Sequence, residues 1–502
     1  LDVRDAAGLD AVLADDNCFV FNKLFPGGFT PRFGAKAMDL ALTTGLRGEL
    51  PGEWSYDLSL SYGTNESDFF IRNTVNASLG PNTPTQFDPG AYTQTDTNFN
   101  ADFSKGFEVG LASELAVALG FEARNEEFEI TVGDAASYTI GPFASLGFSA
   151  ASNGFPGFSP LAGGSWDRSN IALYADLETR IIDTWLVGAA LRWEEFEDFG
   201  TTTNGKLSTH FEASEMVALR ASVSTGFRAP TPGQSNAFNV STEFDSDIGD
   251  LVNNGTIPST NPVALLRGGE ELEPEKSQSL AAGIILQFGT IDITADYFQI
   301  KLEDRIAVSQ LFSLTEEEVQ SLLDSGVTSA ANLQNFRFFT NDFDTTTEGV
   351  DIVATWGTEL GSGDLDISLA FNITETTVDD FTPDVIDEER IRELQEGLPT
   401  TRWTLSPTYT MGDWRYTTRF SYYGDFYDSE DEQTYGDELL VDIEGAYTFA
   451  EQYTLVVGAQ NVLDEYPDEN PNAAGGVGNL YSQFSPSGFG GGFYYLRLRY
   501  DF

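Results

Sequence analysis

The last ten residues of the chain read FYYLRLRYDF (493–502) and alternate between two kinds of side chain. Leu496, Leu498 and Tyr500 would face one way and Arg497 and Arg499 the other, because successive side chains of a β-strand point to opposite faces. Arginine is costly on a surface that faces lipid and tolerated in a water-filled lumen. The segment therefore predicts a strand with one apolar face and one wet face, as in a transmembrane β-barrel.

The same alternation recurs in about seventeen segments, for example in EWSYDLSLSYGTNES (53–67). Most of these segments are longer than the ~5–6 residues common in globular sheets and suit strands that cross a membrane at a tilt. The fold class predicted is an all-β, antiparallel transmembrane barrel. Its strands are expected at 36–48, 53–66, 95–104, 113–127, 166–181, 185–198, 205–212, 215–225, 277–288, 291–303, 346–357, 364–374, 402–411, 413–423, 438–448, 453–461 and 493–502.

The connections between these segments alternate between short and long, with one exception near Gly200 to Asn204. Bacterial barrels have short periplasmic turns, long extracellular loops and an even number of strands. The long connections should therefore share one face, and an odd number of strands should precede the seventeen. We expect residues 1–35 to form an extracellular loop segment, the barrel to occupy 36–502, and short helices to form in the loops at 313–324 and 388–396.

The composition excludes several classes of function. The chain has 502 residues, 79 acidic and 26 basic side chains and a net charge of −53, which argues against nucleic-acid binding. No apolar run approaches the ~20 residues of a transmembrane helix. Cys18 is the one cysteine, so no internal disulfide can form, and a hydrolytic triad would depend on His210, the one histidine, which falls in an alternating stretch. We therefore expect no enzyme.

Four ordered motifs between residues 218 and 502 resemble those of the TonB-dependent outer-membrane receptors. The stretch GFRAPT (226–231) is similar to a strand-to-loop signature of this family, and LEPEKS (272–277) with ITADYFQIKLEDRI (293–306) is similar to its next hairpin. Asn341 with TEGVD (347–351) resembles a strand start, with Asp351 in place of the commoner Glu, and QNVLDEYP (460–467) resembles the last motif. Turn chemistry alone could explain most of these residues, so we expect them to be architectural.

The resemblance implies a 22-stranded barrel, of which about seventeen strands are present here, in the outer membrane of a Gram-negative bacterium. It also implies an N-terminal plug domain that has no counterpart in this chain, so we expect the chain to be the C-terminal part of a longer polypeptide. Through that plug the family couples to the TonB–ExbB–ExbD complex. Phe502 is similar to the terminal aromatic residue that serves the family as an assembly signal.

Five residues in the predicted outer part are candidates for contact with a small-molecule ligand. Aromatic rings can stack on a ligand, and arginines are rare positive charges in an acidic vestibule. Loop packing and pairing with neighbouring carboxylates are the competing explanations. The candidates are Trp166, Arg228, Arg337, Phe338 and Tyr427.

Acidic residues cluster in the predicted outer loops, and the closest spacing is Asp245, Asp247 and Asp250. Oxygen-rich clusters can hold Ca²⁺, although this spacing lacks the full pattern of an EF-hand loop. Solvated loop charge is the alternative explanation. No other cofactor is expected.

The function expected from the resemblance is energy-coupled uptake of a scarce nutrient, such as a ferric siderophore, another metal chelate or an oligosaccharide. Outer-membrane lipid and a surface lipoprotein are its other expected partners. A passive porin-like channel and a barrel hydrolase that uses His210 are the alternatives.

Overall fold

The computed structural model describes residues 6–501 apart from 16–17, 161, 246–249, 325–329, 331–332, 334, 431 and 474–478. The side chains of 6–9, 241–245 and 250–253 also lie outside the description.

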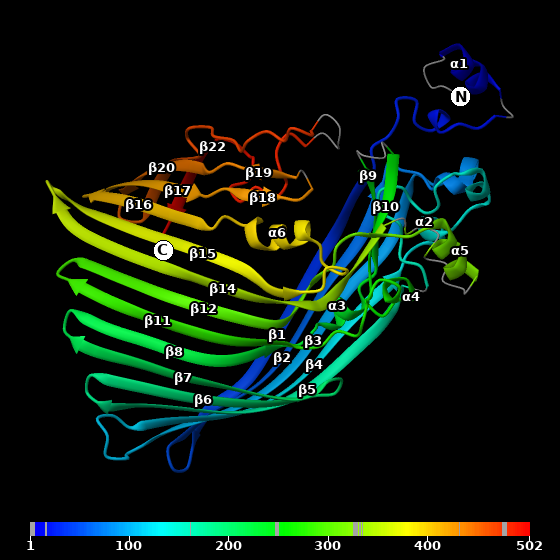
Figure 1. Cartoon of the computed structure of the whole chain (residues 1–502). Coiled ribbons are helices and arrows are strands. Elements are labelled where there is room, and N and C mark those ends of the chain that lie inside the picture. The colour runs from blue at the N-terminus through cyan, green and yellow to red at the C-terminus, as the bar shows by residue number, and fades with distance from the viewer. Residues whose placement is uncertain are drawn as a thin grey trace.

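Seventeen long strands form one curved antiparallel wall in the described part of the chain (Figure 1). All seventeen predicted strands are present, and each pairs with the next long strand along the chain. Their bounds are β1 (Arg32–Leu50), β2 (Trp54–Arg72), β3 (Gln86–Phe107), β4 (Leu115–Val132), β5 (Gly164–Ile182), β6 (Trp185–Phe196), β7 (Gly200–Ser214), β8 (Val217–Arg228), β11 (Glu275–Phe288), β12 (Ile291–Val308), β14 (Asn335–Leu360), β15 (Gly363–Phe381), β16 (Thr401–Met411), β17 (Trp414–Tyr423), β20 (Glu438–Phe449), β21 (Tyr453–Gln460) and β22 (Phe493–Tyr500).

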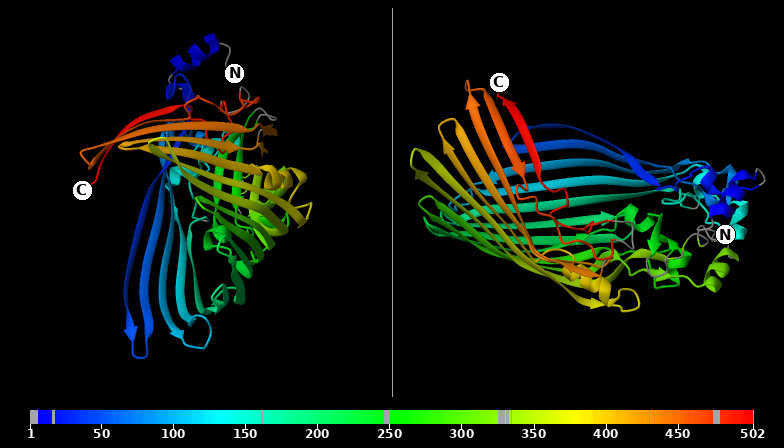
Figure 2. Two further views of the ribbon diagram at one scale, coloured as in Figure 1. Left: turned by 90° about the vertical axis from the view of Figure 1, so that its left-hand side faces the viewer. Right: turned by 90° about the horizontal axis from the view of Figure 1, so that it is seen from above.

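The wall is open between its first and last strands. Within the described residues β1 pairs only with β2, and β22 pairs only with β21. Figure 2 shows the curved sheet from two further directions.

The two faces of the wall differ as the alternation predicts. On β22, Leu496 is 71% exposed and points outward, whereas Tyr495 points inward and donates a hydrogen bond to Glu444 (2.7 Å). The strand registers align the outward residues from strand to strand, so they form one apolar belt that suits contact with lipid. Members of this belt include Leu42, Leu60, Phe99, Leu119, Leu173, Leu191, Leu207, Leu219, Leu280, Leu455 and Leu496.

Short turns join the strands at one end of the wall, which we call the turn end. Aromatic rings gather there: Trp54 packs edge-on against Phe107, and Trp414 lies 4.6 Å from Tyr447 between ring centroids. Rings of this kind mark the membrane interfaces of transmembrane barrels. All the long connections leave the opposite end, the outer end, and the three-residue link between β6 and β7 is the short outer connection expected near Gly200.

The segment before β1 and the outer connections carry the helices and the short strands. Of the two predicted helices, α5 (Glu316–Asp324) starts with the expected capping box between Thr315 and Glu318, and α6 (Glu388–Glu396) is capped by Asp387. None of the helices in the described residues combines the length and apolarity needed to cross a bilayer. The elements that the sequence patterns missed are α1 (Ala6–Ala14), α2 (Ala135–Tyr138), α3 (Pro232–Asn236), α4 (Pro262–Leu265), β9 (Asn239–Asp245), β10 (Asp250–Ile257), β13 (Phe312–Ser313), β18 (Phe426–Asp428) and β19 (Gln433–Tyr435).

The predicted strands stop short of the observed outer ends at several places, and three strands differ by seven residues or more. The strand β3 begins at Gln86 instead of 95, β14 begins at Asn335 instead of 346, and β15 ends at Phe381 instead of 374. These extensions rise above the apolar belt, where strand pairing continues but lipid no longer selects apolar side chains on one face. The period-two pattern fades there for that reason.

Gly349, from the TEGVD motif, is required by the packing between β12, β14 and β15. A Cβ atom on it would lie 2.4 Å from the backbone oxygen of Ile373 and 2.7 Å from the Phe298 ring. We expect Gly349→Ala to lower the free energy of unfolding by about 1–3 kcal/mol, because the nearest obstacle is backbone. The urea midpoint of the refolded receptor measures this. Gly63→Ala is the control, since nothing lies within 4 Å of its added Cβ, and equal midpoints for both variants would contradict the prediction.

Candidate functional site

Two of the sequence motifs meet at the outer end of the wall, where β8 lies beside β11. Arg228 ends β8 and Glu275 begins β11, and the register places them directly opposite each other. Glu275 is only 4% exposed. Its carboxylate accepts a hydrogen bond from the backbone N–H of Ile306 (2.6 Å) and lies 3.8 Å from the Arg228 guanidinium. The motifs therefore bring a buried carboxylate and an arginine together at the outer end.

Asn341 joins two further motif segments to the same region. Its side-chain amide donates to the backbone oxygens of Glu273 (2.7 Å) and Asp304 (2.8 Å), and its oxygen accepts from the N–H of Glu273 (2.8 Å). Asp304 has a φ of +56° at a break in the β12–β14 register. Asn341 thus satisfies backbone groups that the irregular ladder leaves open, which supports an architectural role for these motif residues.

Arg228 and Arg305 lie near Glu275, and Arg390 lies near Arg305; we call these four residues the arginine cluster. Arg305 lies over the Phe343 ring (5.8 Å), and Glu275, Arg228 and Arg390 are among the charged groups near it. Arg390 reaches in from α6, where its Nε donates to the backbone oxygen of Val308 (3.3 Å) and its Nη1 bonds to Glu393. The Arg228 side chain is 60% exposed. A local positive excess is therefore open to solvent, and guanidinium groups bind planar anions well.

A second polar site lines the inner face of the wall, in a recess of about 640 Å³. Arg220 donates two hydrogen bonds to Asp296 (2.7 and 2.5 Å), and Asn372 donates one to Asp351 (2.8 Å). Asp296 and Asp351 both come from the sequence motifs. Arg402 completes the recess and lies over the Tyr423 ring (4.9 Å).

Two of the five predicted ligand contacts serve loop packing in this structure. The Trp166 ring is half-buried and stacks on Phe128 (6.2 Å between centroids) within an aromatic cluster. Phe338 is fully buried and stacks on Phe312 (5.6 Å) in a neighbouring cluster. Phe238 packs against both clusters. The Phe338 ring is not at a surface that a ligand could reach.

Arg337 and Tyr427 lie elsewhere in the outer connections. Arg337 is exposed and its Nε lies 3.4 Å from Thr256 Oγ1. Tyr427 is buried beneath the guanidinium of Arg392 (3.9 Å), and burial followed by the nearby Glu389 carboxylate raises the pKa of its hydroxyl.

The five candidates do not form one site. Apart from the chain neighbours Arg337 and Phe338, no hydrogen bond, ion pair or ring contact joins any two of them in the described residues. Only Arg228 belongs to the arginine cluster. The sequence patterns missed Arg305, Arg390 and Glu275 as members of a site. The two motifs that contain Arg228 and Glu275 were the available signal, because they flank one strand pair.

Another outer arginine, Arg267, is neutralised, as expected from the acidic composition. Arg267 donates to both carboxylate oxygens of Glu318 (2.8 and 2.9 Å). The Arg267 guanidinium, with hydrogen bonds from Thr315, lowers the pKa of Glu318 to about 2. Arg267 therefore has little capacity left for a ligand.

The predicted metal site falls largely outside the described residues. Asp247 is not described, nor are the side chains of Asp245 and Asp250, although their backbones are paired in the β9–β10 hairpin. Among the residues that are described, no group of three or more metal-type side chains could hold an ion. Calcium binding by Asp245, Asp247 and Asp250 stays a prediction. Phe502, the predicted assembly signal, is also outside the description.

Residues 15–462 match the family model described as TonB dependent receptor-like, beta-barrel. No curated protein matches the chain. Among solved structures, a variant of the ferric enterobactin receptor PfeA from Pseudomonas aeruginosa is similar at 15% identity and a TM-score of 0.61, over 93% of this chain and 62% of that one. The siderophore receptor PirA from Acinetobacter baumannii is similar at 16% identity and a TM-score of 0.59, over 98% and 65%.

The ferripyoverdine receptor of Pseudomonas aeruginosa is similar at 13% identity and a TM-score of 0.53, over 86% of this chain and 52% of that one. Identities this low establish the shared fold alone, and the chain spans less than two thirds of the length of all three receptors. The hydrolase alternative lacks support, because His210 lies within β7, opposite Arg220 in the adjacent strand. The family match over most of its length shows that the chain belongs to the TonB dependent receptor-like β-barrel family, a family of outer-membrane receptors and not of enzymes.

Proposed function

We propose that the whole receptor takes up an anionic metal chelate, of the ferric siderophore kind, across the outer membrane of a Gram-negative bacterium. The observation that carries this proposal is the arginine cluster, in which Arg228 and Arg305 lie near the single carboxylate of Glu275, and Arg390, paired with Glu393, lies near Arg305. The similar structures are described as receptors for ferric enterobactin and ferripyoverdine, which supports the same class of substrate. Energy for release would come from the TonB–ExbB–ExbD complex.

The acidity of the chain makes the arginine cluster the favoured place for an anionic ligand. With 79 acidic and 26 basic side chains, most of the outer surface repels an anion. A local positive site in such a field would orient an anionic ligand toward one place. Arg228, with its exposed side chain, is the group assigned to the ligand, whereas Arg305 supplies positive potential beside it. A neutral oligosaccharide would gain little from this arrangement.

The first test compares binding of an iron-loaded catecholate chelate to cells that display the full-length receptor or its Arg228→Gln variant. We expect the variant to bind about tenfold or more weakly, because one hydrogen bond to a charged group contributes about 1.5–3 kcal/mol. Arg337→Gln is the matched control, since Arg337 is also an exposed arginine of the outer region but has no contact with the cluster. Equal weakening in both variants, or none in Arg228→Gln, would contradict the role of the cluster.

Uptake by the same cells separates the receptor from a passive channel. An uncoupler that dissipates the proton-motive force should stop accumulation of the chelate while leaving surface binding intact. A passive channel would continue to equilibrate the chelate under these conditions, and that result would overturn energy coupling.

A further inference from the structure

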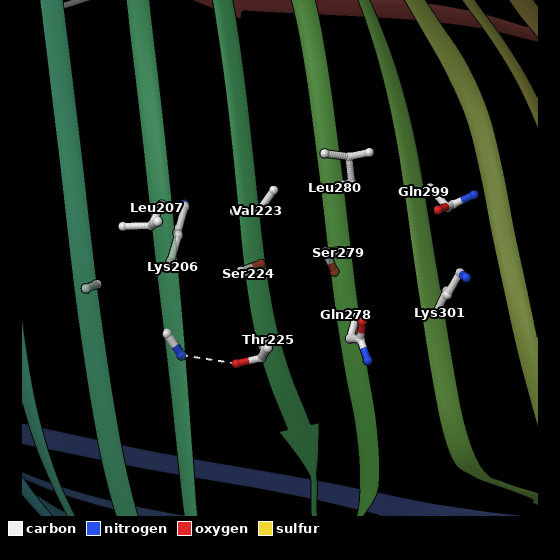
Figure 3. Close-up of a pocket in the computed structure, with 12 residues that line it drawn as sticks. Lys206, Leu207, Val223, Ser224, Thr225, Gln278, Ser279, Leu280, Gln299 and Lys301 are labelled. Carbon is white, nitrogen blue, oxygen red and sulfur yellow. Dashed lines mark hydrogen bonds between the residues drawn. The ribbon is translucent and has the colours of Figure 1, made fainter.

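The end of β8 that carries Arg228 has a neighbouring strand on one side only. It stays paired with β11 to its last residue. On the other side, the ladder between β7 and β8 stops at the pair Lys206 and Ser224. Just beyond this pair the N–H of Gly205 donates to the Thr225 hydroxyl (3.1 Å) instead of to backbone, and the two strands separate (Figure 3). A group other than β7 must therefore hold Arg228 in place on its open side.

The side chain of Arg168, from β5, lies on this open side. Arg168 is directly opposite Glu126 in the register, and its side chain is only 7% exposed. Its Nη1 donates to the backbone oxygen of Pro230 (2.5 Å), and its Nη2 donates to the Glu126 carboxylate (2.5 Å). The carboxylate of Asp198, in the connection between β6 and β7, lies 3.6 Å from Nη1. One guanidinium thus joins the segment that follows β8 to three neighbouring parts of the wall.

The same guanidinium covers the rings that hold Phe227. It lies 5.4 Å from the centre of the Phe196 ring and 6.0 Å from that of Phe199. Both rings pack edge-on against Phe227, at 5.5 and 6.3 Å between centroids. Phe227 directly precedes Arg228, and Pro230 follows it two residues later. Arg228 is therefore held at both flanks by groups that this one guanidinium contacts.

The contacts beyond Pro230 continue the same support. The N–H of Thr231 donates to the side-chain oxygen of Gln234 (2.9 Å), and the N–H of Gln234 donates to the Thr231 hydroxyl (3.1 Å). This capping box starts α3, which packs against β4 and β5. The segment that follows Arg228 is therefore anchored to the same strands as Arg168.

An arginine suits this place better than a lysine. Its planar fork donates to a carbonyl and a carboxylate at once, while its face lies on aromatic rings. Because Arg168 is buried and the carboxylates of Glu126 and Asp198 lie beside it, its guanidinium is not available to a ligand. Any effect of Arg168 on a ligand has to pass through Arg228.

We propose that Arg168 is a positioning residue that fixes Arg228 for an anionic chelate. This inference rests on the proposed function, in which Arg228 is the group assigned to the ligand. An arginine that is already held in place loses less conformational freedom when the ligand binds, so the affinity is higher.

The first experiment measures the position itself. A nitroxide spin label at residue 229, in the full-length receptor with Cys18→Ser, reports local mobility by electron paramagnetic resonance in lipid vesicles. We expect Arg168→Met, which keeps the length of the side chain and removes its donors, to raise the mobility of the label. Arg124→Met is the matched control, because Arg124 also bonds to Glu126 (2.5 Å) but none of its ion pairs in the described residues reaches 226–231. Equal mobility in the wild type and Arg168→Met, or an equal rise in Arg124→Met, would overturn the inference.

The second experiment is a double-mutant cycle on the binding of an iron-loaded catecholate chelate. We expect Arg168→Met to weaken binding about two- to tenfold, the range that immobilising one flexible side chain accounts for. In a receptor that already carries Arg228→Gln, the same substitution should change the affinity little, because Arg168 acts through Arg228. Arg168→Lys keeps a donor for the Pro230 carbonyl and should recover part of the loss. A loss of equal size in both backgrounds would show a general structural effect and overturn the positioning role.

The two experiments separate this inference from the proposed function. If Arg228→Gln itself leaves chelate binding unchanged, the proposed function fails, and the mobility of the label still decides whether Arg168 holds the segment. If Arg228→Gln weakens binding and Arg168→Met does not, the proposed function stands and the positioning role fails.

Discussion

Replacing Glu275 by alanine is expected to lower the free energy of unfolding by about 1–3 kcal/mol, the cost of leaving a buried hydrogen-bonding group, here the N–H of Ile306, without its partner. The carboxylate is almost fully buried, accepts a hydrogen bond from the N–H of Ile306 and lies near the guanidinium groups of Arg228 and Arg305. Without it, Arg228, Arg305 and Arg390 repel one another, and the N–H of Ile306 loses its acceptor.

Two companion variants separate these contributions. Glu275→Gln keeps an acceptor for the Ile306 N–H but removes the charge, so its loss should be smaller than that of Glu275→Ala and should shrink in high salt, which screens repulsion among the arginines. Glu271→Ala removes an exposed carboxylate four residues away and should change stability little. Urea unfolding of the receptor in lipid vesicles measures all three. A loss of less than 1 kcal/mol in Glu275→Ala would show that the arginines do not depend on Glu275.

The strands of the wall were predictable because lipid imposes a strict rule on them. A residue such as Leu496 must be apolar and its neighbour Arg497 need not be, and this contrast survives in a single sequence. Above the apolar belt this constraint on the outward side chains no longer applies. The first residues of β14, which contain Arg337 and Phe338, pair with β10 and β13 above the belt, and nothing in their order distinguishes them from a loop.

The site was less predictable than the wall, because it depends on which distant segments become neighbours. Arg228 and Glu275 are 47 positions apart, and Arg390 comes from a helix another 115 positions along the chain. Their proximity follows from the β8–β11 pairing, which the two flanking motifs signal, and from the packing of α6, which has no local sequence signal. Phe338 is the opposite case, because it was predicted to contact a ligand and instead packs in a loop core. An aromatic residue that fills a loop core and one that stacks on a ligand look alike in sequence, and burial alone separates them.

One face of the wall meets lipid and the other meets water. This difference predicts a large effect of substitution on stability at one of two neighbouring positions in β6. Leu191 is 57% exposed on the outward face, whereas Arg192 points inward and bonds to Glu122 (3.0 Å) and Glu194. Leu191 lies six residues beyond Trp185 at the turn end, or ~14 Å into the apolar band for a strand tilted near 45°.

Leu191→Arg should therefore lower the free energy of unfolding in a bilayer by about 2–4 kcal/mol, the cost of an arginine near the bilayer midplane. Ala190→Arg is the matched control, because Ala190 precedes Leu191, faces inward and lies opposite Asp176, which can pair with the new arginine. Its cost should stay below about 1 kcal/mol. Measured in vesicles of saturated lipid, the difference between the two variants reports which face meets hydrocarbon. If both variants lose the same stability, the inward face is as dry as the outward one, and the water-filled lumen from which the transport function is argued would not exist.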